Sequence, residues 1–66
     1  MNAARSMKIA MAQRDLNQEQ LASLAGITQS SISGLAGRNK WNGESLVKIS
    51  KALGLKVSEF VALGED

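Results

Sequence analysis

Glycine and helix-capping residues divide this 66-residue chain into short segments, and it contains no proline. Glycine lies at positions 26, 34, 37, 43, 54 and 64, and the segments between carry apolar residues at the spacing of amphipathic helices. No stretch alternates with period two for long enough to indicate a strand. The pattern therefore predicts an all-α protein built from five short helices.

The helices are expected at residues 3–14, from 18 to the left-handed turn at Gly26, at 29–35, at 43–53, and from a cap at Ser58 to 63. The other N-caps should be Asn17, which forms a capping box with Gln20, then Thr28, and either Asn42 or Gly43. Helices this short are marginal alone and need a shared core. We expect that core to contain Met7, Ala10, Met11, Leu16, Leu21, Ala22, Ala25, Ile27, Ile32, Leu35, Leu46, Ile49, Leu53, Leu55, Val57 and Phe60.

The residue types that are missing exclude most enzyme chemistry. Without cysteine, histidine or tyrosine, the chain has no disulfide, no thiol nucleophile, no imidazole base and no cluster of zinc ligands. The many serines have no base to activate them. We therefore expect a protein that is not an enzyme and that holds no metal or cofactor.

The charges are unevenly distributed along the chain. Lysine and arginine number eight against six aspartates and glutamates, for a net charge of +2, yet residues 1–58 hold all eight bases and only three acids. This cationic body favours a polyanionic partner. The N-terminal segment has no apolar run long enough for a secretory signal or a membrane span, so we expect a cytoplasmic protein with no membrane partner.

Residues 18–37 (QEQLASLAGITQSSISGLAG) have the spacing of two helices joined by a tight turn. Ala22 is a small residue where the two backbones would cross, and Gly26 accepts a positive φ in the turn. Ile32 and Leu35 would attach the second helix to the core by one side. The N-terminal part of that helix would then project outward, in a shape that fits the major groove of DNA.

Together with LNQEQLA before it and SLVKISKALGLKVSEF after it, this segment resembles the helix-turn-helix family of lambdoid phage repressors and Cro proteins. The resemblance covers nearly the whole chain. It implies a compact five-helix bundle of the phage repressor DNA-binding domain type, with one domain over residues 1–66. It also implies a transcriptional repressor that binds a palindromic double-stranded DNA operator as a homodimer and needs no small-molecule ligand.

The resemblance also implies which residues meet DNA and a second subunit. Gln29 is the strongest candidate for reading a base, because its amide can make a bidentate pair with adenine, and the methyl group of Thr28 could pack on thymine. Arg5, Lys8 and Arg14 are weaker candidates for the DNA backbone. The expected base contacts are Thr28, Gln29, Ser30, Ser33 and Gly34; the backbone contacts are Gln18, Arg38, Asn39 and Lys40; the dimer contacts are Leu55, Val57, Glu59 and Phe60.

Three features depart from the family pattern. Many members pair an arginine in the first helix with a glutamate after the recognition helix, whereas the matching residues here are Met11 and Ala36, which predict an apolar contact. Gly34 costs a helix about 1 kcal/mol relative to alanine, so either it allows a close approach to DNA or it is simply tolerated. Glu44 lies where relatives carry a cation, which argues against a minor-groove contact from that loop.

Two questions stay open from the sequence. Trp41 could cover the core as a lid, stack against a partner chain or rest on the DNA backbone, and we favour the lid or the interface. The same fold also serves in antitoxins, so the alternative function is a protein-interaction module that binds DNA only secondarily.

Overall fold

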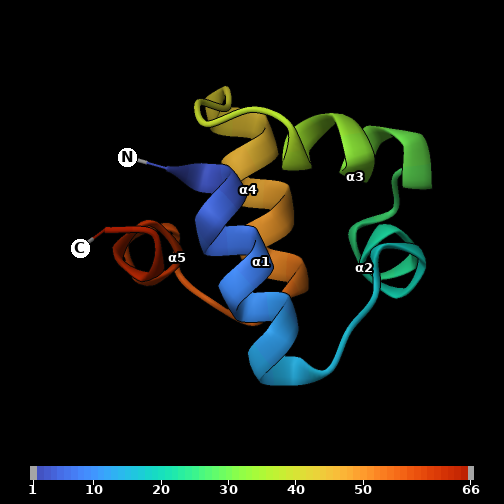
Figure 1. Cartoon of the computed structure of the whole chain (residues 1–66), viewed down its shortest axis with the longest axis horizontal. Helices are drawn as coiled ribbons and strands as arrows, with labels where there is room; N and C mark the ends of the chain where they lie inside the picture. Colours follow the sequence, from blue (N-terminus) through green and yellow to red (C-terminus); the bar gives the residue numbers. More distant parts are fainter. Residues whose placement is uncertain (1, 66) are drawn as a thin grey trace.

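The computed structural model describes residues 2–65, and this part of the chain forms five α-helices and no strand. The all-α prediction is confirmed. In Figure 1, α1 lies in front of α4, α5 flanks them on one side, and α2 and α3 flank them on the other. The helices are α1 (Ala3–Arg14), α2 (Gln18–Ala25), α3 (Gln29–Ala36), α4 (Gly43–Ala52) and α5 (Val57–Leu63).

Most helices begin where a side chain satisfies a free backbone N–H group. The Asn17 and Thr28 side chains accept hydrogen bonds from the N–H groups of Gln20 (2.8 Å) and Ser31 (3.1 Å), as predicted. Asn42 caps α4 and accepts from Ser45 N–H at 2.8 Å, which decides between the two caps considered for that helix. The capping box of α2 is complete, because the Gln20 side chain accepts from Asn17 N–H at 2.9 Å.

The start of α5 was predicted wrongly. The helix begins at Val57 with Lys56 at the N-cap position, not after a cap at Ser58. The reason is a carboxylate further along, because Glu59 Oε1 accepts a hydrogen bond from Lys56 N–H at 2.9 Å. A side chain inside the first turn therefore reaches back to the helix start.

A single apolar cluster joins the helices. Half of the sixteen predicted core residues are buried in it, and most of the others are half-buried and pack around it. Val57 was predicted to be buried but is 36% exposed, because the first turn of α5 lies at the surface. The largest completely buried apolar side chains are Phe60, Met7, Leu21, Ile32 and Ile49.

Trp41 was left out of the predicted core, yet it is only 9% exposed and belongs to the cluster. Its ring lies 5.6 Å from that of Phe60, measured between centroids. The lid interpretation of this residue is confirmed.

Over residues 2–65, no helix has the length and apolar character needed to cross a membrane.

Candidate nucleic-acid interface

α2 and α3 pack against each other in the predicted helix-turn-helix arrangement. Ala22 is 5% exposed, and Gly26 takes up the left-handed conformation with φ of +70°. Ile32 is the one buried residue of α3, with Leu35 half-buried beside it. α3 is therefore held from one side, and it lies along one end of the molecule (Figure 1).

The residues predicted to contact bases are all exposed. Thr28 lies at the start of α3, where its hydroxyl is engaged in the cap and lies 2.9 Å from Ser31 Oγ, so its methyl group is the part left for a partner. Gly34 has open space at the position of a Cβ atom. Ser33 differs from the others, because its hydroxyl donates to Gln18 Oε1 at 2.8 Å.

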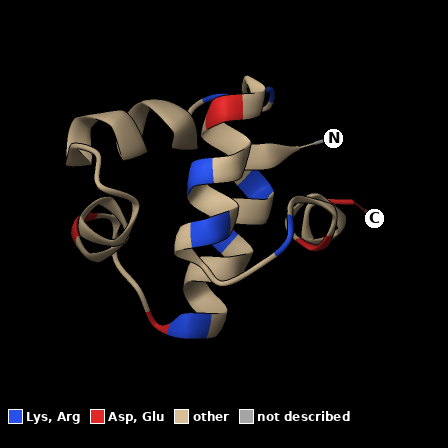
Figure 2. Ribbon diagram, turned by 180° about the vertical axis from the view of Figure 1, so that it is seen from behind, with Lys and Arg blue, Asp and Glu red and all other residues tan. Residues whose placement is uncertain are grey.

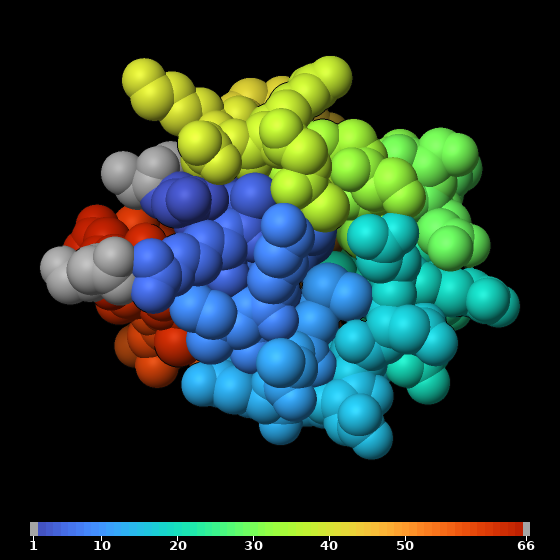
Figure 3. Space-filling view, in the orientation of Figure 1, coloured from blue at the N-terminus to red at the C-terminus, as the bar shows by residue number. Residues whose placement is uncertain are grey.

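The loop after α3 carries three of the four predicted backbone contacts, those at residues 38–40, and hydrogen bonds hold it in place, while Gln18 lies at the start of α2. The indole N–H of Trp41 lies 3.0 Å from two carbonyl oxygens, those of Leu35 and Arg38. The carbonyl of Asn39 accepts from Ala3 N–H at 2.9 Å, which attaches the loop to the start of α1. Residues 38–40 are exposed, and Figure 3 shows side chains of this yellow-green segment projecting beyond the surface next to α3.

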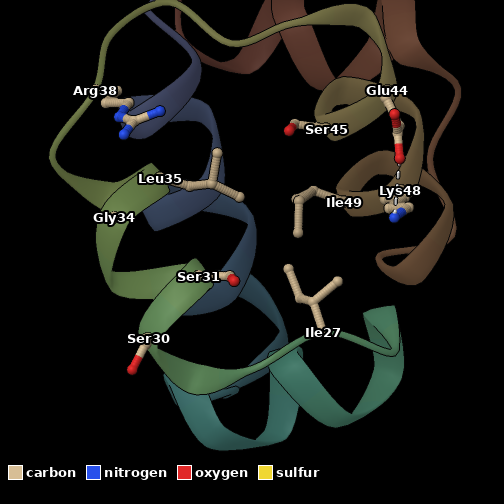
Figure 4. Close-up of a pocket in the computed structure, with 10 residues that line it drawn as sticks. All are labelled: Ile27, Ser30, Ser31, Gly34, Leu35, Arg38, Glu44, Ser45, Lys48 and Ile49. Carbon is tan, nitrogen blue, oxygen red and sulfur yellow. Dashed lines mark ion pairs between the residues drawn. The ribbon is translucent and has the colours of Figure 1, made fainter.

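Charge is distributed so that α3 itself carries none and the basic loop follows it. No Lys, Arg, Asp or Glu lies on α3, which is tan throughout Figure 2. Glu44, at the start of α4, forms an ion pair with Lys48 at 3.1 Å. That pair lies at the edge of a cleft of about 480 Å³ between α3 and α4, with Ile27, Leu35 and Ile49 lining its interior (Figure 4).

An exposed polar helix, held by one buried residue and followed by a cationic loop, has the form of a DNA-reading element. The sequence model of the family described as Cro/C1-type HTH DNA-binding domain matches residues 6–66. The chain belongs to this Cro/C1-type family. The match confirms the resemblance to phage repressors and Cro proteins. No match was found among curated proteins.

Phe60 is the one predicted dimer contact of this Cro/C1-type domain that must be corrected. Its side chain is 0% exposed and packs in the core, so it has no surface to offer a second subunit. Leu55 is half-buried, and Val57 and Glu59 are exposed. Two of the predicted dimer contacts are therefore exposed, one is half-buried, and Phe60 belongs to the core.

Arg14 makes contacts within the Cro/C1-type fold that the sequence did not predict. Arg14, a weaker candidate for the DNA backbone, donates from Nε to the carbonyl of Leu53 at 3.0 Å and from Nη1 to that of Ala10 at 3.3 Å. It therefore ties the end of α1 to the end of α4, a role that no local pattern indicates. Met11 and Ala36, which the sequence predicted to form an apolar contact, are both half-buried against the core.

Proposed function

We propose that this Cro/C1-type protein is a cytoplasmic transcriptional repressor that places α3 in the major groove of a double-stranded DNA operator. The observation that carries the proposal is the exposure of α3. Its polar residues face solvent, while Ile32 alone is buried within the helix. A rigid helix attached by one side can enter a groove without unfolding or rearranging its own core.

The residues of α3 would read bases by their different chemical groups. Gln29 is exposed and its amide can donate to N7 and accept from N6–H of adenine. The free methyl group of Thr28 suits thymine, and Ser30 has reach for one hydrogen bond to a base, a phosphate or a bridging water. Gly34 has space around it for close approach of the DNA.

The DNA backbone would be bound on both sides of α3. Gln18 lies at the first position of α2, where the capping box serves the N–H groups of Asn17 and Gln20 and the helix end attracts an anion. Arg38, Asn39 and Lys40 lie on the anchored loop at the other end of α3. Such contacts position a protein on the duplex without specifying its sequence.

The repressor would act as a homodimer on an operator of two-fold symmetry, without a cofactor or small-molecule ligand. One domain of this size buries too little surface for tight specific binding. Two copies joined through the surface residues Leu55, Val57 and Glu59 would place two α3 helices about one helical turn of DNA apart. Occupation of promoter DNA would then cause repression.

The test is selection of operators from random duplexes, followed by binding measurements on two variants. Gln29→Ala should relax the preference at one base pair by about 1–3 kcal/mol, because it removes a bidentate base contact. Arg38→Ala should weaken binding to all sequences alike and reduce the salt slope by about 1. Lys51→Ala, on the exposed side of α4, is the matched control and should bind as the wild type does.

Two outcomes would count against this function. If both Gln29→Ala and Arg38→Ala weaken all sequences equally, Gln29 reads no base. If the wild-type protein binds every duplex more weakly than millimolar at low salt, the cationic face is no nucleic-acid surface, and a protein-interaction role such as that of an antitoxin replaces it.

A further inference from the structure

One hydrogen bond links the two helices of the helix-turn-helix motif through side chains that both face its outer surface. Ser33 Oγ on α3 donates to Gln18 Oε1 on α2 at 2.8 Å, although the two residues are 15 positions apart in the chain. Ser33 is exposed and Gln18 is half-buried. The bond therefore lies at the surface, between a predicted base contact and a predicted phosphate contact.

In this structure the bond leaves the NH₂ end of the Gln18 amide available. A glutamine side chain has an acceptor oxygen and a donor NH₂ group, and rotation of the amide exchanges them. Here Ser33 engages the oxygen, so the NH₂ group, with its two N–H donors, is the end left for another partner. Phosphate oxygens only accept hydrogen bonds, so this is the orientation that binds DNA, whereas the rotated amide would present its oxygen to the phosphate.

The same bond limits what Ser33 can do. Its hydroxyl has one hydrogen, which is already donated to Gln18, and it keeps only acceptor capacity. While it makes this bond it has no donor for N7 and O6 of guanine, N7 of adenine or O4 of thymine, and it could only accept from the amino group of adenine or cytosine. This sets it apart from Gln29, whose amide can both donate and accept.

We propose that Ser33 is a positioning residue, which holds the Gln18 amide with its NH₂ group toward a DNA phosphate and reads no base itself. The inference rests on the proposed function and changes the role first expected for Ser33. A base-reading serine and a positioning serine predict different results for the same substitution. A base reader sets the preference at one base pair, and a positioning residue sets the strength of one phosphate contact at any sequence.

The first experiment measures binding of Ser33→Ala to the selected operator and to its single-base-pair variants. We expect affinity to fall roughly three- to tenfold on every duplex, with the base preferences unchanged, because one hydrogen bond that orients a phosphate ligand is lost. Ser33→Thr keeps the hydroxyl and should bind within about twofold of wild type. Ser23→Ala, an exposed serine on α2, is the matched control and should have no effect.

The second experiment locates the phosphate. Operator phosphates are replaced one at a time by neutral methylphosphonates, and wild-type affinity should fall most at one backbone position near α2. That sensitivity should shrink in Gln18→Ala and in Ser33→Ala, and the double variant should bind no more weakly than Gln18→Ala alone. Circular dichroism of each variant verifies that it is folded.

The outcomes separate this inference from the proposed function. If Ser33→Ala changes the preference at one base pair and leaves the methylphosphonate pattern intact, Ser33 reads a base and the positioning role is wrong. Additive losses in the double variant would likewise overturn it. If the wild type binds no duplex at all, the proposed function itself fails, and this inference fails with it.

Discussion

The two ends of this small protein use their residues in opposite ways. α1 contributes five buried residues and packs against α5, whereas α3 contributes one buried residue and leaves its polar side chains in solvent. Burial stabilises α1 and α5 together, and it leaves α3 free to bind. The buried residues are therefore concentrated away from the surface that would touch DNA.

The two regions also use glycine differently. Gly64, just after α5, lies so close to α1 that a Cβ atom would collide with the carbonyl oxygen of Asn2 and the hydroxyl of Ser6. Gly34, within α3, has nothing within 4 Å of that position. The first glycine is required by packing inside the molecule, while no contact within the molecule requires the second.

The largest expected effect is at the centre of the packed region. Phe60→Ala removes a completely buried aromatic side chain that contacts Trp41, so we expect a loss of about 3–5 kcal/mol in the free energy of unfolding. Urea denaturation measures it. Val57→Ala, at an exposed position of the same helix, should cost less than about 0.5 kcal/mol.

A loss of that size can unfold a protein this small, so Phe60→Leu provides a second measurement with an expected cost of about 1–1.5 kcal/mol. Both Phe60 variants should lose stability in proportion to the volume removed. A Phe60→Ala protein that keeps wild-type stability and fails only to dimerise would restore Phe60 to the interface and contradict the burial argument.

The paired glycine substitutions should have opposite signs. Gly64→Ala should destabilise the protein by about 1–3 kcal/mol, because the new methyl group forces α5 away from α1. Thermal or urea unfolding detects the change. Unchanged stability would mean that the start of α1 can move aside without cost, and the close packing at this end would not be a constraint.

Gly34→Ala should stabilise the protein by about 1 kcal/mol, since alanine favours a helix interior and meets no neighbour here. Its DNA affinity then separates the two roles left open for Gly34. If α3 must approach DNA closely, the variant binds more weakly although it is more stable. If the glycine is merely tolerated, binding is unchanged.

Local signals in the sequence predicted the helices well. Caps at Asn17 and Thr28, and the turn at Gly26, act within a few residues, so the bounds of α2 match and α3 extends one residue further than expected. The bounds of α1 match as well. The start of α5 was missed because two side chains compete there. Ser58 has the residue type of a cap, but the Glu59 carboxylate reaches back to Lys56 N–H instead.

Contacts between distant segments were much harder to predict. Ser33 was correctly expected on the outer face of α3, but its bond to Gln18 depends on how α2 and α3 cross. Arg14 looked like any surface cation until α4 brought the carbonyl of Leu53 within its reach. Phe60 was expected both in the core and at a dimer surface, and only the packed fold decides between them.

The last prediction tests the residue that connects the two regions, and its expected effect is no larger than that of Gly34→Ala. Trp41 packs on Phe60 of α5. Its indole N–H points toward the carbonyl oxygens of Leu35, near the end of α3, and Arg38, in the basic loop. Trp41→Phe keeps an aromatic ring against Phe60 but removes this donor. We expect a loss of about 1 kcal/mol in the free energy of unfolding, together with faster amide hydrogen exchange in residues 38–41.

Hydrogen exchange in the Trp41 variant compares the packed region of α1 and α5 with the loop that follows α3. If the indole carries rigidity from the packed region into the loop, exchange rises there and stays unchanged in α1, whose residues remain buried. If exchange in the loop does not change, the bond from Ala3 N–H to the Asn39 carbonyl is sufficient to hold it. The loop would then be held to α1 by this backbone hydrogen bond alone, and Trp41 would contribute only to the core.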